Sequence, residues 1–365
     1  MTTTTSQRQH IDISAIEREL AALWKQSDDG DGPQVTRACV MTLIAPVQGL
    51  SAAQDAAAVI VRLTDRFPNR AIVIDSAPEQ QADSLDAWVQ ANCQLPAAGR
   101  TQICCEQITI DARGVAVARV PGTVLPLLVP DVPVVLWWPQ GNPLGSPLFE
   151  RLSALANRVI IDSASFSEPE PQLRTLLTTF GARSRVSDLS WGRLTPWREL
   201  IAQFFDSPAN VPHLHAACRV TVQYDAPATT LDRVQPLMFV GWLAAKLEWQ
   251  ATAPIEERPD AAFTLRRPDG GTVEILLVPA PLATPDAARL AAVELRCAEA
   301  TFQVERSSAV NCAMATAQIG NAAPLRRVVR LERSDTAELL AEELRLFGRD
   351  RGYEGALRAA ATMVS

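Results

Sequence analysis

Histidine and glycine-rich loops are scarce in this 365-residue sequence. Its three histidines lie at positions 10, 213 and 215, and so few argue against a histidine-activated nucleophile. Neither G-x-G-x-x-G nor G-x-x-x-x-G-K-[ST] follows a predicted strand, and the turn at 45–51 holds a single glycine. Because a chain approaches a pyrophosphate closely only where several glycines permit it, conventional dinucleotide binding is not expected.

Clusters of basic residues and long apolar runs are also missing. The net charge is −7 without any run of Lys and Arg, the opposite of a nucleic-acid-binding surface. No apolar run reaches the roughly 18 residues of a membrane helix, and the polar start does not resemble a secretory signal. The seven cysteines form no C-x-x-C, so we expect free thiols, including the adjacent Cys104 and Cys105. These features predict a cytoplasmic protein that binds neither nucleic acid nor membrane.

The first half of the chain alternates short apolar runs with helical patterns. After a tail with an amphipathic helix at 13–24, the predicted strands are 38–47, 71–75, 101–111, 132–138 and 158–162, and the predicted helices are 52–67, 116–128 and 146–156. Continuous apolar runs are typical of strands buried on both faces of a parallel sheet. Their alternation with helices predicts a Rossmann-like, doubly wound, mostly parallel α/β layer.

The second half follows a different pattern, after a break at 167–171 (SEPEP) that is typical of a linker. Apolar and polar residues alternate at 219–225, 272–278, 292–298, 302–306 and 326–333, and helical patterns occupy 231–249, 335–347 and 353–361. Such alternation predicts a C-terminal α+β domain on a mainly antiparallel sheet. We therefore expect a tail and helix at 1–34, a Rossmann-like domain at 35–167 and an α+β domain at 168–365.

A few residues invite a chemical interpretation. Asp75 and Asp162 each end a predicted strand, where a carboxylate could serve acid–base chemistry or hold Mg²⁺, although capping the next helix is its more common role. His213, His215 and Cys218 could ligate a metal ion, but no further ligand is apparent nearby. The simpler interpretation is that these histidines lie at the surface.

Two tryptophan-rich segments stand out. The first, at 129–139, ends in Trp137, Trp138 and Pro139. In a strand the two indoles point to opposite faces, and the proline ends the strand. We expect Trp138 and Pro139 to lie at the carboxyl end of this strand, where α/β sheets present ligand or partner surfaces.

The second segment spans 188–206. Trp197 begins a core stripe at helical spacing, and Trp242 lies on a similar stripe of a later helix. Trp191 and Arg193 precede the helix, so we expect them to face outward. Tryptophan and arginine anchor interfaces more often than most residue types, which makes Trp191, Arg193 and Arg198 candidates for contact with a partner.

Several strings of the chain, in order, resemble the glucose-6-phosphate dehydrogenase assembly protein family, OpcA. The strings are VPDVPVVLWWP, RVIIDSASF, DLSWGRLTPWRELIAQFFD, GWLAAKLEW and LLAEELRLFGRDRGYEGALRAA. The resemblance runs from about residue 35 to the end and is far more specific than a short motif.

The resemblance implies a protein that is not an enzyme and needs no cofactor. Members of the family bind glucose-6-phosphate dehydrogenase and promote its assembly or active state. Trp138, Pro139, Trp191, Arg193 and Arg198 are then the candidate partner contacts. The alternative is a sugar-phosphate- or nucleotide-binding α/β enzyme with its crevice near Asp75 and Asp162, and a third hypothesis is a regulatory ligand site in the first domain. The sequence leaves open the contacting surface, the stoichiometry and self-association.

Overall fold

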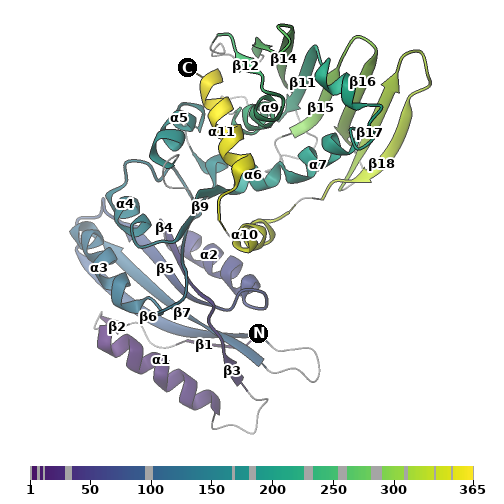
Figure 1. Cartoon of the computed structure of the whole chain (residues 1–365). Helices are drawn as coiled ribbons and strands as arrows, with labels where there is room; N and C mark the ends of the chain where they lie inside the picture. The colour runs from purple at the N-terminus through teal and green to yellow at the C-terminus, as the bar shows by residue number, and fades with distance from the viewer. Residues whose placement is uncertain are drawn as a thin grey trace. The chain divides into compact units, whose positions relative to one another are not determined.

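The protein consists of two compact units, each built around its own sheet (Figure 1). The computed structural model describes residues 2–5, 9–10, 13–28, 35–94, 102–166, 169–180, 186–225, 233–253, 261–280, 290–307, 311–332, 334–346 and 348–364. Unit 1 comprises residues 1–162, 185–187 and 336–347, and unit 2 comprises residues 163–184, 188–335 and 348–365. Within the described part of the chain, none of the helices combines the length and apolar character that crossing a membrane requires.

Five neighbouring parallel strands form the centre of the unit 1 sheet, in the order β7-β5-β4-β8-β9. They are β4 (Met41–Val47), β5 (Asn69–Ala77), β7 (Gln102–Arg113), β8 (Val134–Trp138) and β9 (Arg158–Ile161). The sheet grows from β4 through β5 to β7, and the chain then crosses back to place β8 on the other side of β4. This order confirms the predicted Rossmann-like, doubly wound layer.

Shorter and antiparallel strands extend this sheet. They are β1 (Thr2–Thr5), β2 (Gln9–His10), β3 (Val35–Arg37), β6 (Ser84–Gln94) and β10 (Val186–Asp188). None of these five strands was predicted; the longest, β6, runs antiparallel to β7. Its buried Leu85, Ala87 and Val89 alternate with half-buried residues, which is the signature of a strand with one face packed on the core.

The helices of unit 1 are mostly those the sequence predicts. They are α1 (Ile13–Asp28), α2 (Leu50–Leu63), α3 (Val120–Val124), α4 (Pro147–Ser153) and α10 (Thr336–Arg345), with the 3₁₀ turns η1 (Gly114–Arg119) and η2 (Leu125–Leu127). The single helix expected at 116–128 is wrong, because η1, α3 and η2 follow one another there. Prolines 121 and 126 start new helical turns, since proline has no N–H to continue the preceding turn.

The cysteines of the first sheet correct one expectation. Cys104 of β7 is disulfide-bonded, so the expected free thiol at this position is wrong. In the antiparallel register of β6 and β7, the residue directly opposite Cys104 is Cys93. Cys105 points to the other face and is a free, buried thiol, as expected.

Unit 2 contains a mainly antiparallel sheet, as predicted. Its order is β12-β13-β14-β11-β15-β16-β17-β18, and β11 and β14 form its parallel pair. The strands are β11 (Arg219–Tyr224), β12 (Gln250–Ala251), β13 (Ala261–Arg266), β14 (Thr272–Pro279), β15 (Leu290–Arg296), β16 (Ala300–Arg306), β17 (Cys312–Ile319) and β18 (Leu325–Arg330). Along β11, the fully buried Val220, Val222 and Tyr224 alternate with half-buried residues.

Unit 2 also contains helices. They are α5 (Pro169–Phe180), α6 (Leu189–Arg193), α7 (Thr195–Gln203), α8 (Val211–His215), α9 (Val234–Leu247) and α11 (Arg351–Met363), with the 3₁₀ turn η3 (Ser163–Ser165). The linker expected at 167–171 is corrected from Pro169 onward, because α5 begins there, and proline favours the first turn of a helix. The helices α9 and α11 pack closely at Gly241, where a Cβ atom would overlap the carbonyl oxygen of Ala356.

The division into units differs from the expected contiguous boundary at residue 167. Unit 1 also takes in residues 185–187 and 336–347. The first of these segments belongs to β10, which follows β9 in the sheet, and the second contains α10, which packs against α2. Residues distant in sequence therefore complete the first unit.

Candidate functional site

A cavity of about 670 Å³ opens in unit 1 where parallel strands end. Val47 closes β4, Ser76 lies near the end of β5, and Trp138 is the last residue of β8. Residues of η1, α3, α4 and the loop at 140–142 also contribute to the lining. Because the sheet order reverses between β4 and β8, this is the position where doubly wound sheets bind their ligands.

Trp138 forms part of the cavity wall, as its place at the strand end predicts. It is half-buried, and its ring meets Phe149 of α4 edge to face, with the ring centroids 5.2 Å apart and the planes at 87°. Pro139 follows and is also half-buried. The neighbouring Trp137 is 1% exposed, so the strand sends one indole into the core and the other to the cavity.

An apolar wall of the cavity depends on Gly114, the first residue of η1. Gly114 adopts φ 57°, and a Cβ atom there would overlap the carboxylate of Asp83. That carboxylate accepts the Val115 amide N–H at 2.8 Å. The turn leaves the Val115 side chain 76% exposed at the cavity, beside Val117 and Ala118.

The turn that leads from β4 into α2 is occupied by a carboxylate of the chain itself. The Gly49 amide donates to Asp75 Oδ1 at 2.7 Å, and Arg113 Nη2 donates to Asp75 Oδ2 at 2.6 Å. The hydrogen bond with Asp75 raises the pKa of the Arg113 guanidinium. In dinucleotide-binding sheets the amides of this turn face the pyrophosphate. Here the buried Asp75 accepts the first of these amide N–H groups, so that this donor is not available to a pyrophosphate.

The structure does not favour the alternative enzyme site near Asp75 and Asp162. Asp75 is 3% exposed and paired with Arg113, Asp162 is 9% exposed, and neither lines the cavity. The described residues contain no group of three or more His, Cys, Asp or Glu that could hold a metal ion. His213 instead lies with Nδ1 3.6 Å from Cys297 Sγ.

The second tryptophan segment belongs to the core of unit 2, which corrects the expected outward orientation of Trp191. Its side chain is 2% exposed, its Nε1 donates to Asp350 Oδ2 at 2.8 Å, and the Arg198 guanidinium carbon lies 3.4 Å from the ring centroid. The reason is that Asp188 caps a separate short helix, α6, which contains Trp191 and lies before the helix that we predicted. Trp197 is 2% exposed and confirms its predicted core position, whereas Trp242 is half-buried.

The five predicted partner contacts therefore separate into two sets. Trp138 lines the cavity of unit 1, and Pro139 is the next residue in the chain. Arg193 and Arg198 are half-buried in unit 2, where Arg198 also donates to Thr195 Oγ1 at 2.8 Å. These four positions stay predictions for a partner surface, and Trp191 is removed from the set.

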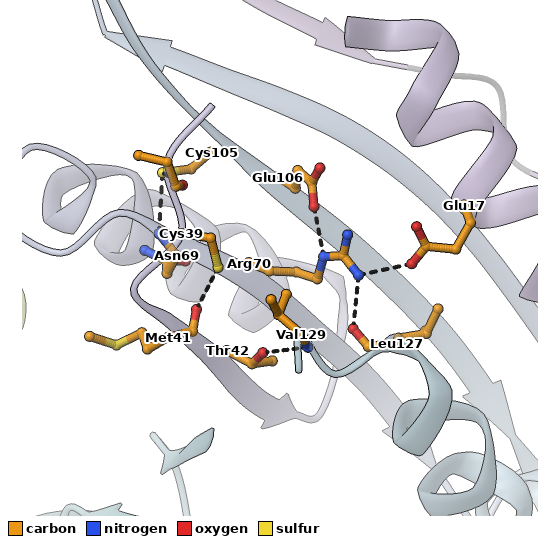
Figure 2. Close-up of polar contacts among 11 residues, drawn as sticks. Glu17, Cys39, Met41, Thr42, Asn69, Arg70, Cys105, Glu106, Leu127 and Val129 are labelled. Atoms are coloured by element: carbon orange, nitrogen blue, oxygen red, sulfur yellow. Dashed lines mark hydrogen bonds and ion pairs between the residues drawn. The ribbon is translucent and has the colours of Figure 1, made fainter. Parts of the chain in front are cut away.

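A buried arginine that the sequence analysis did not single out lies near the start of β5. Arg70 Nε donates to Glu106 at 2.6 Å, and Nη1 donates to Glu17 of α1 at 2.8 Å and to the Leu127 carbonyl at 3.0 Å (Figure 2). Burial lowers the pKa of Arg70, but the charges and hydrogen bonds of Glu106 and Glu17 raise it further, so that it ends above the usual value. The arrangement fixes α1 and η2 on the sheet; Arg70 is committed to the fold.

Comparison with known proteins matches both halves of the chain to one family. Residues 61–178 match the glucose-6-phosphate dehydrogenase subunit N-terminal domain, and residues 184–357 match its C-terminal domain. The OxPP cycle protein OpcA of Nostoc punctiforme is 37% identical over 183 residues, covering 50% of this chain and 38% of the relative. The protein of the same name from a Synechocystis species is 28% identical over 296 residues, covering 77% and 61%. The matched region thus spans less than two thirds of the length of either relative.

A solved structure resembles the fold alone. A mutant of KijD10, a 3-ketoreductase from Actinomadura kijaniata in complex with TDP-benzene and NADP, is similar with a TM-score of 0.50 at 8% sequence identity, covering 89% of this chain and 95% of that chain. At this identity the likeness supports the Rossmann-like architecture and no chemistry. By its two family domains, the chain belongs to the OpcA family of glucose-6-phosphate dehydrogenase assembly proteins.

Proposed function

We propose that this protein is a non-catalytic partner that binds glucose-6-phosphate dehydrogenase and promotes its assembly and activation. Membership of the OpcA family supports the identity of the partner. The observation that carries the non-catalytic part is the turn before α2. There Asp75 holds the Gly49 amide and Arg113, so the position that serves a dinucleotide in related folds is taken by an internal carboxylate. The protein works in the cytoplasm and needs no cofactor.

Activation by such a partner requires a difference in affinity. A bound protein raises the activity of an enzyme only if it binds the active conformation more tightly than the inactive one. A coupling free energy of about 1–3 kcal/mol, or about 5–150-fold in affinity, is typical of such effects. By linkage, substrate bound to the dehydrogenase then tightens the complex by the same factor.

The test combines the purified protein with the dehydrogenase of the same organism. We expect a complex on a sizing column with light-scattering detection, and a lower apparent KM for glucose 6-phosphate. Serum albumin at equal concentration is the control for non-specific stabilisation. The protein alone, given glucose 6-phosphate and NADP⁺, should produce no NADPH. The absence of both complex and kinetic change would contradict the proposal, and turnover by the protein alone would contradict its non-catalytic part.

A charge reversal tests the predicted contact at Arg193 separately. Arg193→Glu should weaken the complex, because an arginine at an interface changed to the opposite charge faces like charge or an unpaired partner. Arg266→Glu, an exposed position of β13 in the same unit, is the matched control. If both variants bind equally well, Arg193 is not a contact, while the proposed function stands.

A further inference from the structure

The strand-end cavity of unit 1 has the size and place of a small-molecule site. Its volume of about 670 Å³ lies within the range of roughly 300–1,000 Å³ that is typical of ligand pockets. It opens beside β4 and β8, where the sheet order reverses. Both features are independent of the partner that the protein binds.

The lining of this cavity is largely apolar and includes one indole. Trp138 is held in place by its edge-to-face contact with Phe149. Other apolar residues contribute from η1, α3 and α4, namely Val115, Val117, Ala118, Pro121, Pro147 and Leu148. Indoles favour stacked or edge contacts with another ring, so this lining suits a flat ring better than a flexible polar chain.

Polar groups at the cavity fall into two classes. Some are committed to the fold: Ser146 Oγ accepts the Phe149 amide N–H at 3.3 Å, and Asn142 Oδ1 accepts the Leu144 amide N–H at 3.0 Å. The amides of Gln48 and Gln140 make no hydrogen bond to another described residue. Each offers both donors and an acceptor, which is what the edge of a heteroaromatic ring requires.

The charged groups at and beside the cavity do not assemble a phosphate site. Among the described residues that line it, none is Asp or Glu and Arg151 is the charged one, with its Nη1 bonded to the Ala118 carbonyl. The start of α2 would ordinarily attract a phosphate. Here the Asp75 carboxylate already accepts the Gly49 amide N–H. A phosphate brought to this turn would meet two carboxylates, Asp75 and Asp111, which share the single guanidinium of Arg113.

We propose that the cavity at the ends of β4, β5 and β8 binds an uncharged, flat heteroaromatic molecule of nucleoside size. Trp138 contacts the ring, and Gln48 and Gln140 bond its polar edge. This site goes beyond the proposed function, because it makes the assembly protein itself a receptor for a small molecule. It also differs from a dinucleotide site, because it takes a ring without phosphates.

Calorimetric titration of the full chain with adenosine, guanosine, cytidine and uridine tests the proposal. We expect at least one of them to bind, and its 5′-monophosphate to bind about tenfold more weakly, because a charged phosphate loses hydration when it enters a largely apolar cavity. NAD⁺ should also bind more weakly than the nucleoside. If no nucleoside binds, or if a phosphorylated form binds as tightly or more tightly, the proposal is overturned.

Substitutions locate the binding within the cavity. Val115→Trp fills the cavity from a side chain that is 76% exposed, so it should abolish nucleoside binding and leave the melting temperature unchanged. Leu125→Trp is the control, since Leu125 is 56% exposed in η2 and does not line the cavity. Gln140→Ala should weaken binding. Unchanged binding by Val115→Trp would overturn the site. If Val115→Trp instead breaks the dehydrogenase complex while no nucleoside binds, the cavity receives a partner side chain and the proposal is also overturned.

Discussion

Gly114 shows how much a single backbone position contributes to the cavity. Its φ of 57° and its contact with Asp83 leave no room for a side chain. We expect Gly114→Ala to lower the free energy of unfolding by about 1–3 kcal/mol, as for other strained backbone positions, measured by urea denaturation. Gly122→Ala is the matched control in the adjacent α3, where nothing lies within 4 Å of the added Cβ. That change should be neutral or slightly stabilising, and equal losses in both variants would contradict the interpretation.

The buried thiol of Cys105 predicts a dependence of stability on pH. Burial raises the pKa of Cys105 from 9.0 to about 11, despite the hydrogen bond that its sulfur accepts from the Asn69 amide. Because the folded pKa is the higher one, the stabilisation is complete below pH 9 and is lost as the pH rises toward 11. The slope approaches about 1 kcal/mol per pH unit in this window. From pH 8 to pH 10, the urea midpoint should decrease more for the wild type than for Cys105→Ala. An equal decrease in both proteins would show that Cys105 is not the titrating group.

At the residue scale, local sequence predicted positions but not long-range partners. Trp138 lies at its strand end and Trp197 in the core, because strand and helix periodicity alone decide them. Trp191 was misjudged because its partner Asp350 is 159 residues away. The internal use of Asp75 depends likewise on Arg113 from another strand. No local pattern reveals such pairs.

Among the elements, α1 is held to the sheet by the cluster around Arg70 shown in Figure 2. The two acidic partners differ in burial: the side chain of Glu106 is 5% exposed and that of Glu17 is 47% exposed. We expect Glu106→Gln to lower the free energy of unfolding by about 3–5 kcal/mol, because it leaves the buried charge of Arg70 without its main partner. Glu17→Gln should cost less than about 1 kcal/mol, as exposed ion pairs do. Chemical denaturation of both variants measures the difference, and similar losses would show that burial does not decide their contributions.

Strands and helices differed in how well the sequence predicted them. The parallel strands were found because each is a continuous apolar run between helices. The antiparallel β6 was missed although its apolar and polar residues alternate. The reason is that strands and helices were expected to follow one another in turn in that half of the chain. The segment 116–128, expected to be one helix, forms three short helical pieces. Its apolar periodicity is helical, but the prolines at 121 and 126 each interrupt the backbone hydrogen bonding.

For the molecule as a whole, the sequence predicted two units but not which segments complete them. The helix α10 lies after all the strands of unit 2 in sequence, yet it belongs to unit 1. Arg158 of β9 forms an ion pair with Glu343 of α10 at 3.1 Å and also donates to the Leu346 carbonyl. The residues of the ion pair are 185 positions apart. Prediction from neighbouring sequence therefore placed α10 in the second domain instead of the first.

This connection makes a prediction about the first unit in isolation. A fragment of residues 1–166 lacks α10, so the partly buried charge of Arg158 and the face of α2 lose their covering. We expect a peptide of residues 334–346 to bind this fragment and raise its melting temperature in proportion to the occupied fraction, because a ligand of the native state stabilises it. The same peptide carrying Glu343→Ala should bind more weakly, since Arg158 is then left without its carboxylate. Calorimetric melting with each peptide measures both effects. A fragment that melts at the same temperature with and without the unmodified peptide would show that α10 is not needed to complete the first unit.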